Sequence, residues 1–281
     1  MSHFSVMVIG TSELEDISEI LYPYQESSDN PASDSRFIFE DHTDSVFKKY
    51  NNMDTSLRAS WSDVRNKNNL EHNLINFGKW YGGYSVVNGR LGVYSNPNSQ
   101  WDWWEVGGRW TDFFKHKDGS FADSITLEEW DFKGQMREAE ISAGRDWDIA
   151  QGLISKAPPF KTWKHFVDLI DSKAISLDEA QSLYNAQDIF SVWRSNENPT
   201  LNYCSVDAFC VSRDSYVSEK ALRSTLPFAY ILDKHWVERG SMGWFALVSG
   251  EIDIHSWATT FFKMLETLDP RTKLTIVDCH I

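Results

Sequence analysis

The side chains best suited to chemistry lie between residues 96 and 110, where the chain reads NPNSQWDWWEVGGRW. We call this segment the tryptophan motif. Two carboxylates, Asp102 and Glu105, stand among its tryptophans. Paired carboxylates beside aromatic platforms are how glycosidases are built, so an enzyme acting on a glycan or a nucleotide is one interpretation. Sequence spacing fixes neither their separation nor their environment. We therefore favour a role in which Asp102 accepts a hydrogen bond, with Arg109 as its expected partner.

The tryptophans of the motif allow two interpretations. Trp101 and Trp103 alternate around one residue, as on a strand with one buried face, which favours a structural core with a glycine turn after it. In the alternative, some of these rings form a contact patch, because Trp and Arg are residue types that anchor protein interfaces. The candidates for core or interface are Asn96, Trp101, Asp102, Trp103, Gly107, Gly108, Arg109 and Trp110.

No other pattern indicates catalysis. The sequence contains no phosphate-binding loop, nucleophile elbow, zinc-protease helix or dinucleotide fingerprint. The histidines are scattered and have no metal-ligand spacing, and the neighbours Cys279 and His280 would point to opposite faces of a strand. We therefore expect no catalytic residue, no cofactor and no metal.

Net charge limits the class of partner. The chain carries a formal charge of −14, and much of the acidic excess lies in residues 1–60. Such a protein is repelled by nucleic acid and suits a basic protein surface, although simple solubility explains the charge as well. The first residues lack the basic and apolar regions of a signal peptide, and no run approaches the ~20 apolar residues of a membrane span. We expect a cytoplasmic protein without membrane contact.

The three cysteines are too few and too odd in number for a disulfide framework. Cys204 and Cys210 lie six apart, which on one strand places both on the same face, as buried thiols. Cys279 lies close to the last residue, on an expected strand. Either it meets its counterpart in a second copy and marks a self-association contact, or it is an inert thiol.

The hydrophobic pattern predicts an α+β fold in three parts. Residues 1–125 form a mixed α/β part with the tryptophan motif, 126–200 a helical arm, and 201–281 an α+β part with a small sheet and one long helix, which is a possible site of self-association. We expect strands at 4–9, 203–212, 227–232, 243–248 and 274–279, and helices at 11–24, 135–154 and 257–268, with weak helical character over 50–76 and a helical hairpin over 160–190.

Local signals refine these boundaries. Asn88-Gly89 favours a type I′ hairpin, and residues 117–119 favour a second turn. Thr126 with Glu129 and Ser176 with residue 179 fit capping boxes at helix starts, and Thr162 is a further candidate cap.

Five segments of the chain resemble a widespread set of phage proteins: residues 1–10, 96–110, 225–229, 240–245 and 274–281. They occur in order along the whole chain, although 120–200 contributes none. This set is similar to the family that includes the phage Gabija anti-defence protein. The resemblance implies a non-enzymatic inhibitor in the host cytoplasm. It would assemble as a homo-oligomeric shell around the host Gabija complex of ATPase–nuclease and helicase-like subunits, and would block DNA binding and cleavage. A DNA mimic is a further alternative, which the mixed charge beyond residue 60 disfavours.

Overall fold

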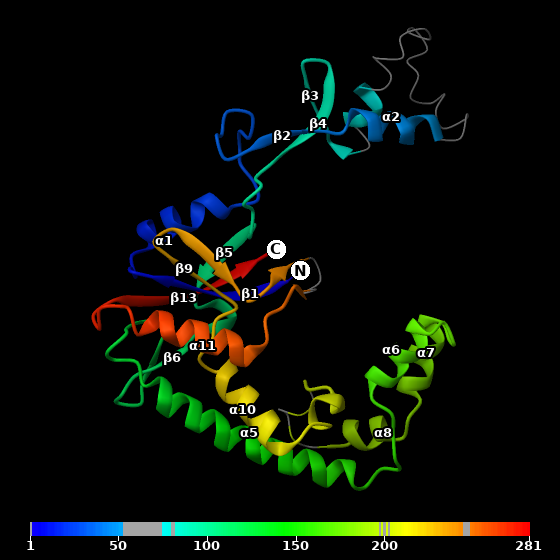
Figure 1. The fold of residues 1–281 in the computed structure, drawn as a ribbon, viewed down its shortest axis with the longest axis vertical. Helices are drawn as coiled ribbons and strands as arrows, with labels where there is room; N and C mark the ends of the chain where they lie inside the picture. Colours follow the sequence, from blue (N-terminus) through cyan, green and yellow to red (C-terminus); the bar gives the residue numbers. More distant parts are fainter. Residues whose placement is uncertain are drawn as a thin grey trace.

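A six-stranded mixed sheet organises the computed structural model, which describes residues 2–52, 75–79, 82–196, 198, 201, 203–243 and 248–281 (Figure 1). The strand order is β10–β9–β1–β13–β5. Two strands share the outer edge of β13: β8 pairs with its first residues and β5 with its last residues. β1 runs antiparallel to β13 and parallel to β9. The strands are β1 (His3–Ile9), β5 (Trp103–Val106), β8 (Ser124–Thr126), β9 (Ala229–Leu232), β10 (His235–Glu238) and β13 (Lys273–His280).

Helices cover both faces of this sheet. Alternate residues of a strand point to opposite faces, and the two core clusters separate accordingly. Phe4, Val6 and Val8 of β1 pack with α1 (Leu14–Leu21), whereas Met7 and Ile9 pack with α11 (Ile254–Leu265). The expected end strands 4–9 and 274–279, the strand at 227–232 and the two covering helices are confirmed. α1 ends in the short 3-10 helix η1 (Tyr22–Tyr24).

The termini of the described chain lie side by side (Figure 1), since β1 and β13 pair along their whole length. The first and third expected parts, 1–125 and 201–281, therefore contribute strands to one sheet instead of forming separate cores. The fold belongs to the expected α+β class.

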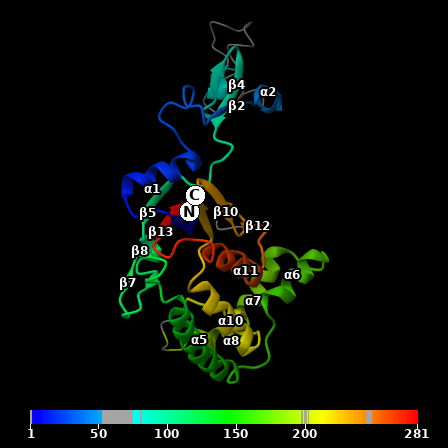
Figure 2. The ribbon, with the colours of Figure 1, turned by 60° about the vertical axis from the view of Figure 1, so that its left-hand side comes forward.

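A small lobe projects from the sheet beyond α1 (Figure 2). It contains the three-stranded sheet β2–β4–β3 and its own small core, formed by Val46, Tyr50, Phe77 and Leu91. Asn88 and Gly89 both adopt positive φ, so the expected type I′ turn is confirmed. Most of the weakly helical stretch expected over 50–76 lies outside the described residues. The elements are β2 (Ile38–Asp41), α2 (Thr43–Asn52), β3 (Ser85–Val87) and β4 (Arg90–Ser95).

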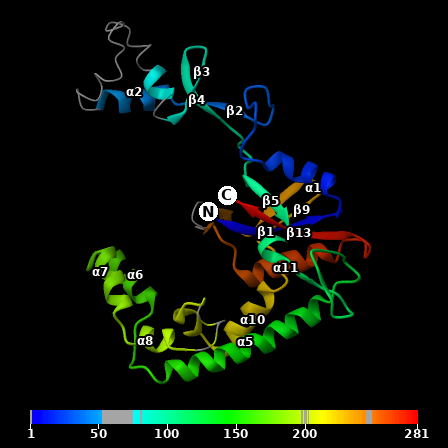
Figure 3. The same ribbon diagram turned by 180° about the vertical axis from the view of Figure 1, so that it is seen from behind.

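A helical lobe lies on the other side of the sheet, where α10 packs along α5 (Figure 3). The expected hairpin over 160–190 is confirmed, and the Ser176 side chain caps α7 by accepting from the Glu179 N–H at 3.2 Å. α5 begins at Phe132, where Asp131 caps it, and not at the capping box expected at Thr126, because Thr126 and Glu129 pair within a preceding turn. The helices are α5 (Phe132–Ile154), α6 (Trp163–Asp171), α7 (Leu177–Asn185), α8 (Ile189–Arg194), η3 (Val206–Phe209) and α10 (Arg213–Arg223).

The prediction of a strand over 203–212 is wrong. η3 and the cap residue of α10 occupy this stretch, and the Ser205 and Ser212 side chains each accept a backbone N–H at the helix starts. Thr162 precedes α6 without capping it, since Asp207 accepts the Trp163 N–H at 2.6 Å instead.

Two short hairpins complete the described chain. β6 (Phe114–Lys115) and β7 (Phe121–Ala122) enclose the turn expected at 117–119, and β11 (Ser241–Met242) pairs with β12 (Val248–Ser249). Most of the strand expected over 243–248 falls outside the described residues. Within the part of the chain that is described, no helix is long and apolar enough to cross a membrane.

Candidate functional site

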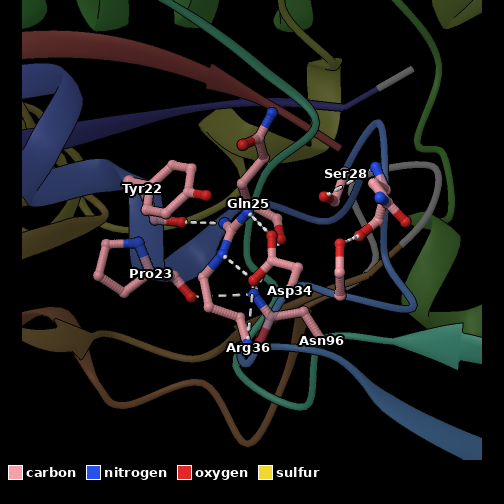
Figure 4. Close-up of polar contacts among 9 residues, drawn as sticks. Tyr22, Pro23, Gln25, Ser28, Asp34, Arg36 and Asn96 are labelled. Atoms are coloured by element: carbon pink, nitrogen blue, oxygen red, sulfur yellow. Dashed lines mark hydrogen bonds and ion pairs between the residues drawn. The ribbon is translucent and has the colours of Figure 1, made fainter.

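The first half of the tryptophan motif is structural. Asn96 is buried, and its Nδ2 donates to the carbonyls of Pro23 and Gln25 at 2.9 Å each (Figure 4). Trp101 is also buried, and its Nε1 donates to the Leu21 carbonyl at 3.1 Å. Both side chains bind the loop before β5 to the end of α1 and to the segment that follows it. The core interpretation is thus confirmed for Trp101.

The second half of the motif faces outward. Trp103 is 46% exposed on β5, which is the last strand at its side of the sheet. Asp102, Glu105 and Arg109 are exposed around it. This arrangement has the residue types of the expected contact patch, and the motif therefore supplies both core and surface.

The glycine pair lets the chain pass close over the sheet. Gly107 and Gly108 have φ values of 71° and 55°, and a Cβ on Gly108 would lie 2.5 Å from the Cβ of Asp278. The next backbone N–H, that of Arg109, donates to Asp278 Oδ2 at 3.0 Å. The glycine turn is confirmed, and it leads into the 3-10 helix η2 (Gly108–Trp110), from which the half-buried Trp110 packs against the α11 side of the core.

Two histidine–carboxylate pairs lie at this end of the sheet. His3 Nδ1 is 2.9 Å from Asp278 Oδ1, and His280 Nδ1 is 2.6 Å from Asp102 Oδ1. The β1–β13 register places His3 opposite His280, and their ring centroids are 4.9 Å apart. The partner of Asp102 is therefore His280 and not the expected Arg109.

The sequence reasoning missed these pairs because their members come from distant parts of the chain. Spacing along the chain cannot show that the first and last strands are neighbours. A usable signal was present in the alternation of His3 with Ser5 and of Asp278 with His280, since residues two apart on a strand share a face.

The sheet face that carries these pairs changes from apolar to polar along its length. Met7 and Ile276 are buried under α11, but the next pair on the same face is Ser5 with Asp278. Asp278 is buried, and both of its carboxylate oxygens accept hydrogen bonds, from His3 and from the Arg109 backbone. His280 Nε2 is also buried and has no hydrogen-bond partner among the described residues.

A cavity of about 290 Å³ opens beside this polar end. Its charged or titratable lining consists of His3, Arg223 and Arg239. Arg239 is 11% exposed and pairs with Glu251, while Arg223 Nε lies 2.8 Å from Glu219 Oε1. Burial and then the charge of Arg223 lower the pKa of Arg239. Part of the lining comes from four of the segments that carry the sequence resemblance, namely 1–10, 96–110, 225–229 and 240–245, whereas Arg223, Arg239, Ile254 and Trp257 lie outside them.

A larger, shallower hollow of about 630 Å³ lies over the loop that follows η1. Figure 4 shows polar contacts of residues that line it, among them Tyr22, Asp34 and Arg36. Arg36 lies 3.5 Å from the centroid of the Tyr22 ring and makes a fork with both oxygens of Asp34, at 3.0 and 2.6 Å. This hydrogen bonding holds the pKa of Asp34 well below its usual range. Because Nε, Nη1 and Nη2 of Arg36 are all engaged, by Asp34 and by the Tyr22 carbonyl, its role is to fix the loop.

Cys279 fits one of the two roles expected for it, whereas Cys204 and Cys210 differ from expectation. Cys279 is completely buried between the sheet and α1, and burial raises the pKa of its thiol. A thiol contact with a second copy would require α1 to move away from the sheet, so this position favours the inert thiol over the self-association contact. Cys204 and Cys210 do not share a strand face, and Cys210 is exposed.

Within the described residues, no three His, Cys, Asp or Glu side chains are arranged to hold a metal ion. No protein-family model matches the chain, and neither curated proteins nor solved structures give a significant match. These comparisons assign neither a family nor an activity.

Proposed function

We propose that this protein acts by binding another protein, as an inhibitor of the host Gabija complex, which is the role that the sequence resemblance implies. The observation that supports a binding role is the outward-facing Trp103. An indole that is 46% exposed at a sheet edge offers a large apolar area to a partner.

The surroundings of Trp103 suit an interface anchor. Its ring meets the His3 ring edge-on, with centroids 6.5 Å apart, so the neighbouring side chain limits its position before binding. Asp102, Glu105 and Arg109 provide polar groups around it. A central aromatic with a polar rim is the usual anatomy of a binding hot spot, and truncation of such a residue costs about 2 kcal/mol or more.

The net charge and the exposed apolar side chains of the helical lobe agree with the same role. The net charge of −14 disfavours direct DNA binding and favours approach to a basic protein surface. The helical lobe also exposes large apolar side chains, Ile141 and Ile149 on α5 and Leu177 and Leu183 on α7. These residues are candidates for the contacts between copies that a multi-copy shell requires.

The test is a titration of Gabija DNA cleavage with the purified protein. We expect suppression to rise with the amount added and to need near-equimolar protein, with Trp103→Ala shifting the half-inhibitory amount upward at least tenfold. Phe121→Ala is the matched control, since Phe121 is 47% exposed on the β6–β7 hairpin.

Each other outcome contradicts part of the proposal. Absence of inhibition by the wild type would reject Gabija as the target. Full suppression at a small fraction of equimolar would favour the enzymatic alternative built on Asp102 and Glu105. An equal effect of Trp103→Ala and Phe121→Ala would reject Trp103 as the anchor.

A further inference from the structure

We infer that the cavity between β1, the last turn of α10 and α11 binds a small organic oxyanion, a phosphate ester or a carboxylate with a compact apolar body. This ligand site goes beyond the proposed function and does not depend on it. The inference rests on the charge of the lining, on an unsatisfied buried donor and on the shape of the apolar wall.

The charge of the lining is opposite to that of the protein. The chain as a whole carries −14, yet the charged side chains that line this cavity are Arg223 and Arg239, and none of its described lining residues is a carboxylate. The partner carboxylates, Glu219 and Glu251, lie on a separate neighbouring cavity that the same two arginines border from the other side. The two guanidinium groups are close enough for the charge of Arg223 to lower the pKa of Arg239. An anion between them would relieve this repulsion.

Arg239, whose side chain lines the cavity, has a buried donor without a partner among the described residues. Arg239 Nε is inaccessible to solvent and has no hydrogen-bond partner in the described part of the chain. A guanidinium has five N–H groups in a fixed fork, and the contact with Glu251 is made by Nη2. Because burying a charged donor without an acceptor is costly, an oxygen acceptor would be bound favourably once the side chain turns this N–H toward the cavity. Guanidinium groups match phosphate and carboxylate oxygens in geometry.

The remaining wall selects an apolar body. Trp110, Phe228 and Trp257 line the cavity together with Leu226, and the Arg239 Cζ lies 6.0 Å from the Phe228 ring centroid. Trp257 uses its own N–H on the Pro227 carbonyl at 2.9 Å, so its indole offers the ligand an apolar surface only. The volume of about 290 Å³ lies at the lower end of ligand pockets, which suits a molecule with a single ring.

His3 adds a hydrogen-bonding group at the cavity wall. Its Nδ1 is held by the buried Asp278 at 2.9 Å, which fixes the ring. A ligand placed on the arginines would therefore also meet an oriented imidazole, and the polar end of the sheet face would become part of the ligand site.

The test is isothermal titration of the full chain with phenyl phosphate, benzoate, inorganic phosphate and neutral benzyl alcohol. We expect one saturable site for phenyl phosphate or benzoate, with Kd below about 1 mM, and at least tenfold weaker binding of benzyl alcohol. The preferred anion then identifies the ligand as a phosphate ester or a carboxylate. Equal affinity for benzyl alcohol, or no saturable binding of either aromatic anion, overturns the inference.

Variants on one helix locate the site. Arg223→Gln should weaken binding of the preferred anion at least tenfold. Arg213→Gln is the matched control, because Arg213 also lies on α10, has the same exposure of 47% and also pairs with a carboxylate, that of Asp148. Arg239→Gln should abolish binding, and circular dichroism checks that each variant is folded. Arg223 is sufficiently exposed for its variant to decide the question alone, and binding that survives Arg223→Gln unchanged refutes the site.

Discussion

Replacing Trp101 with alanine should destabilise the protein strongly. The indole is buried in the cluster between the sheet and α1, where it packs with Ile17 and Leu21. Truncating a core Trp to Ala typically costs about 3–5 kcal/mol. The change also removes the N–H that the Leu21 carbonyl accepts at 3.1 Å, and an unsatisfied buried acceptor costs about 1–3 kcal/mol. We therefore expect a loss of at least about 4 kcal/mol, which lowers the melting temperature by roughly 10 °C or more.

The assay is unfolding in urea followed by far-ultraviolet circular dichroism, because removing a tryptophan alters the fluorescence signal itself. Trp101→Phe separates the two contributions, since it keeps most of the apolar volume and loses only the hydrogen bond, at a cost of about 1–3 kcal/mol. Trp103→Ala is the control and should cost less than about 1 kcal/mol, as for other surface substitutions. If Trp103→Ala destabilises the protein as much as Trp101→Ala, the division of the motif into a buried and an exposed half is refuted.

Three further predictions concern other parts of the protein. Burial raises the pKa of Cys279 well above 9.0 and that of Tyr216 to about 12. The unfolded chain then releases these protons first, so the free energy of unfolding, measured in urea, should fall as the pH rises above 9, and Cys279→Ala should reduce that fall. Asp253→Ala removes the N-cap of α11, whose carboxylate accepts two backbone N–H groups, and should cost about 1 kcal/mol in the same assay. Gly108→Ala should lower the melting temperature through positive φ and the clash with Asp278, whereas unchanged melting would show that the turn has room.

Features with a local cause were predictable from the sequence. The alternating strand near the first residue, the Asn88-Gly89 hairpin and the Ser176 cap each depend on residues a few positions apart. The prediction of a strand over 203–212 was wrong because of a similar local pattern. Its apolar residues alternate as on a strand, but Val206 and Phe209 are buried against the helical lobe, and the serines at 205 and 212 were the local signals for helix starts.

The candidate site could not be predicted, because it depends on pairing between the two ends of the chain. His3 and His280 become neighbours only through the β1–β13 register, and the arginines of the cavity come from α10 and from the residue after β10. The tryptophan motif was recognised from composition. Which of its residues are buried and which are exposed depends, however, on how the rest of the chain covers β5. Composition identified the right segment, whereas the tertiary structure decided which of its residues are available to a partner.

The central position of β13 has a consequence for how the protein is made. This strand joins β1 to β5 and β8, so the sheet needs residues 273–280 before it can assemble. The two lobes have core clusters formed by intervening residues and depend less on this closing step. Contacts between such distant segments slow folding. A nascent chain released before residue 273 would therefore hold a formed helical lobe beside unpaired β strands, a product prone to aggregation, and intact protein requires synthesis to run to the final strand.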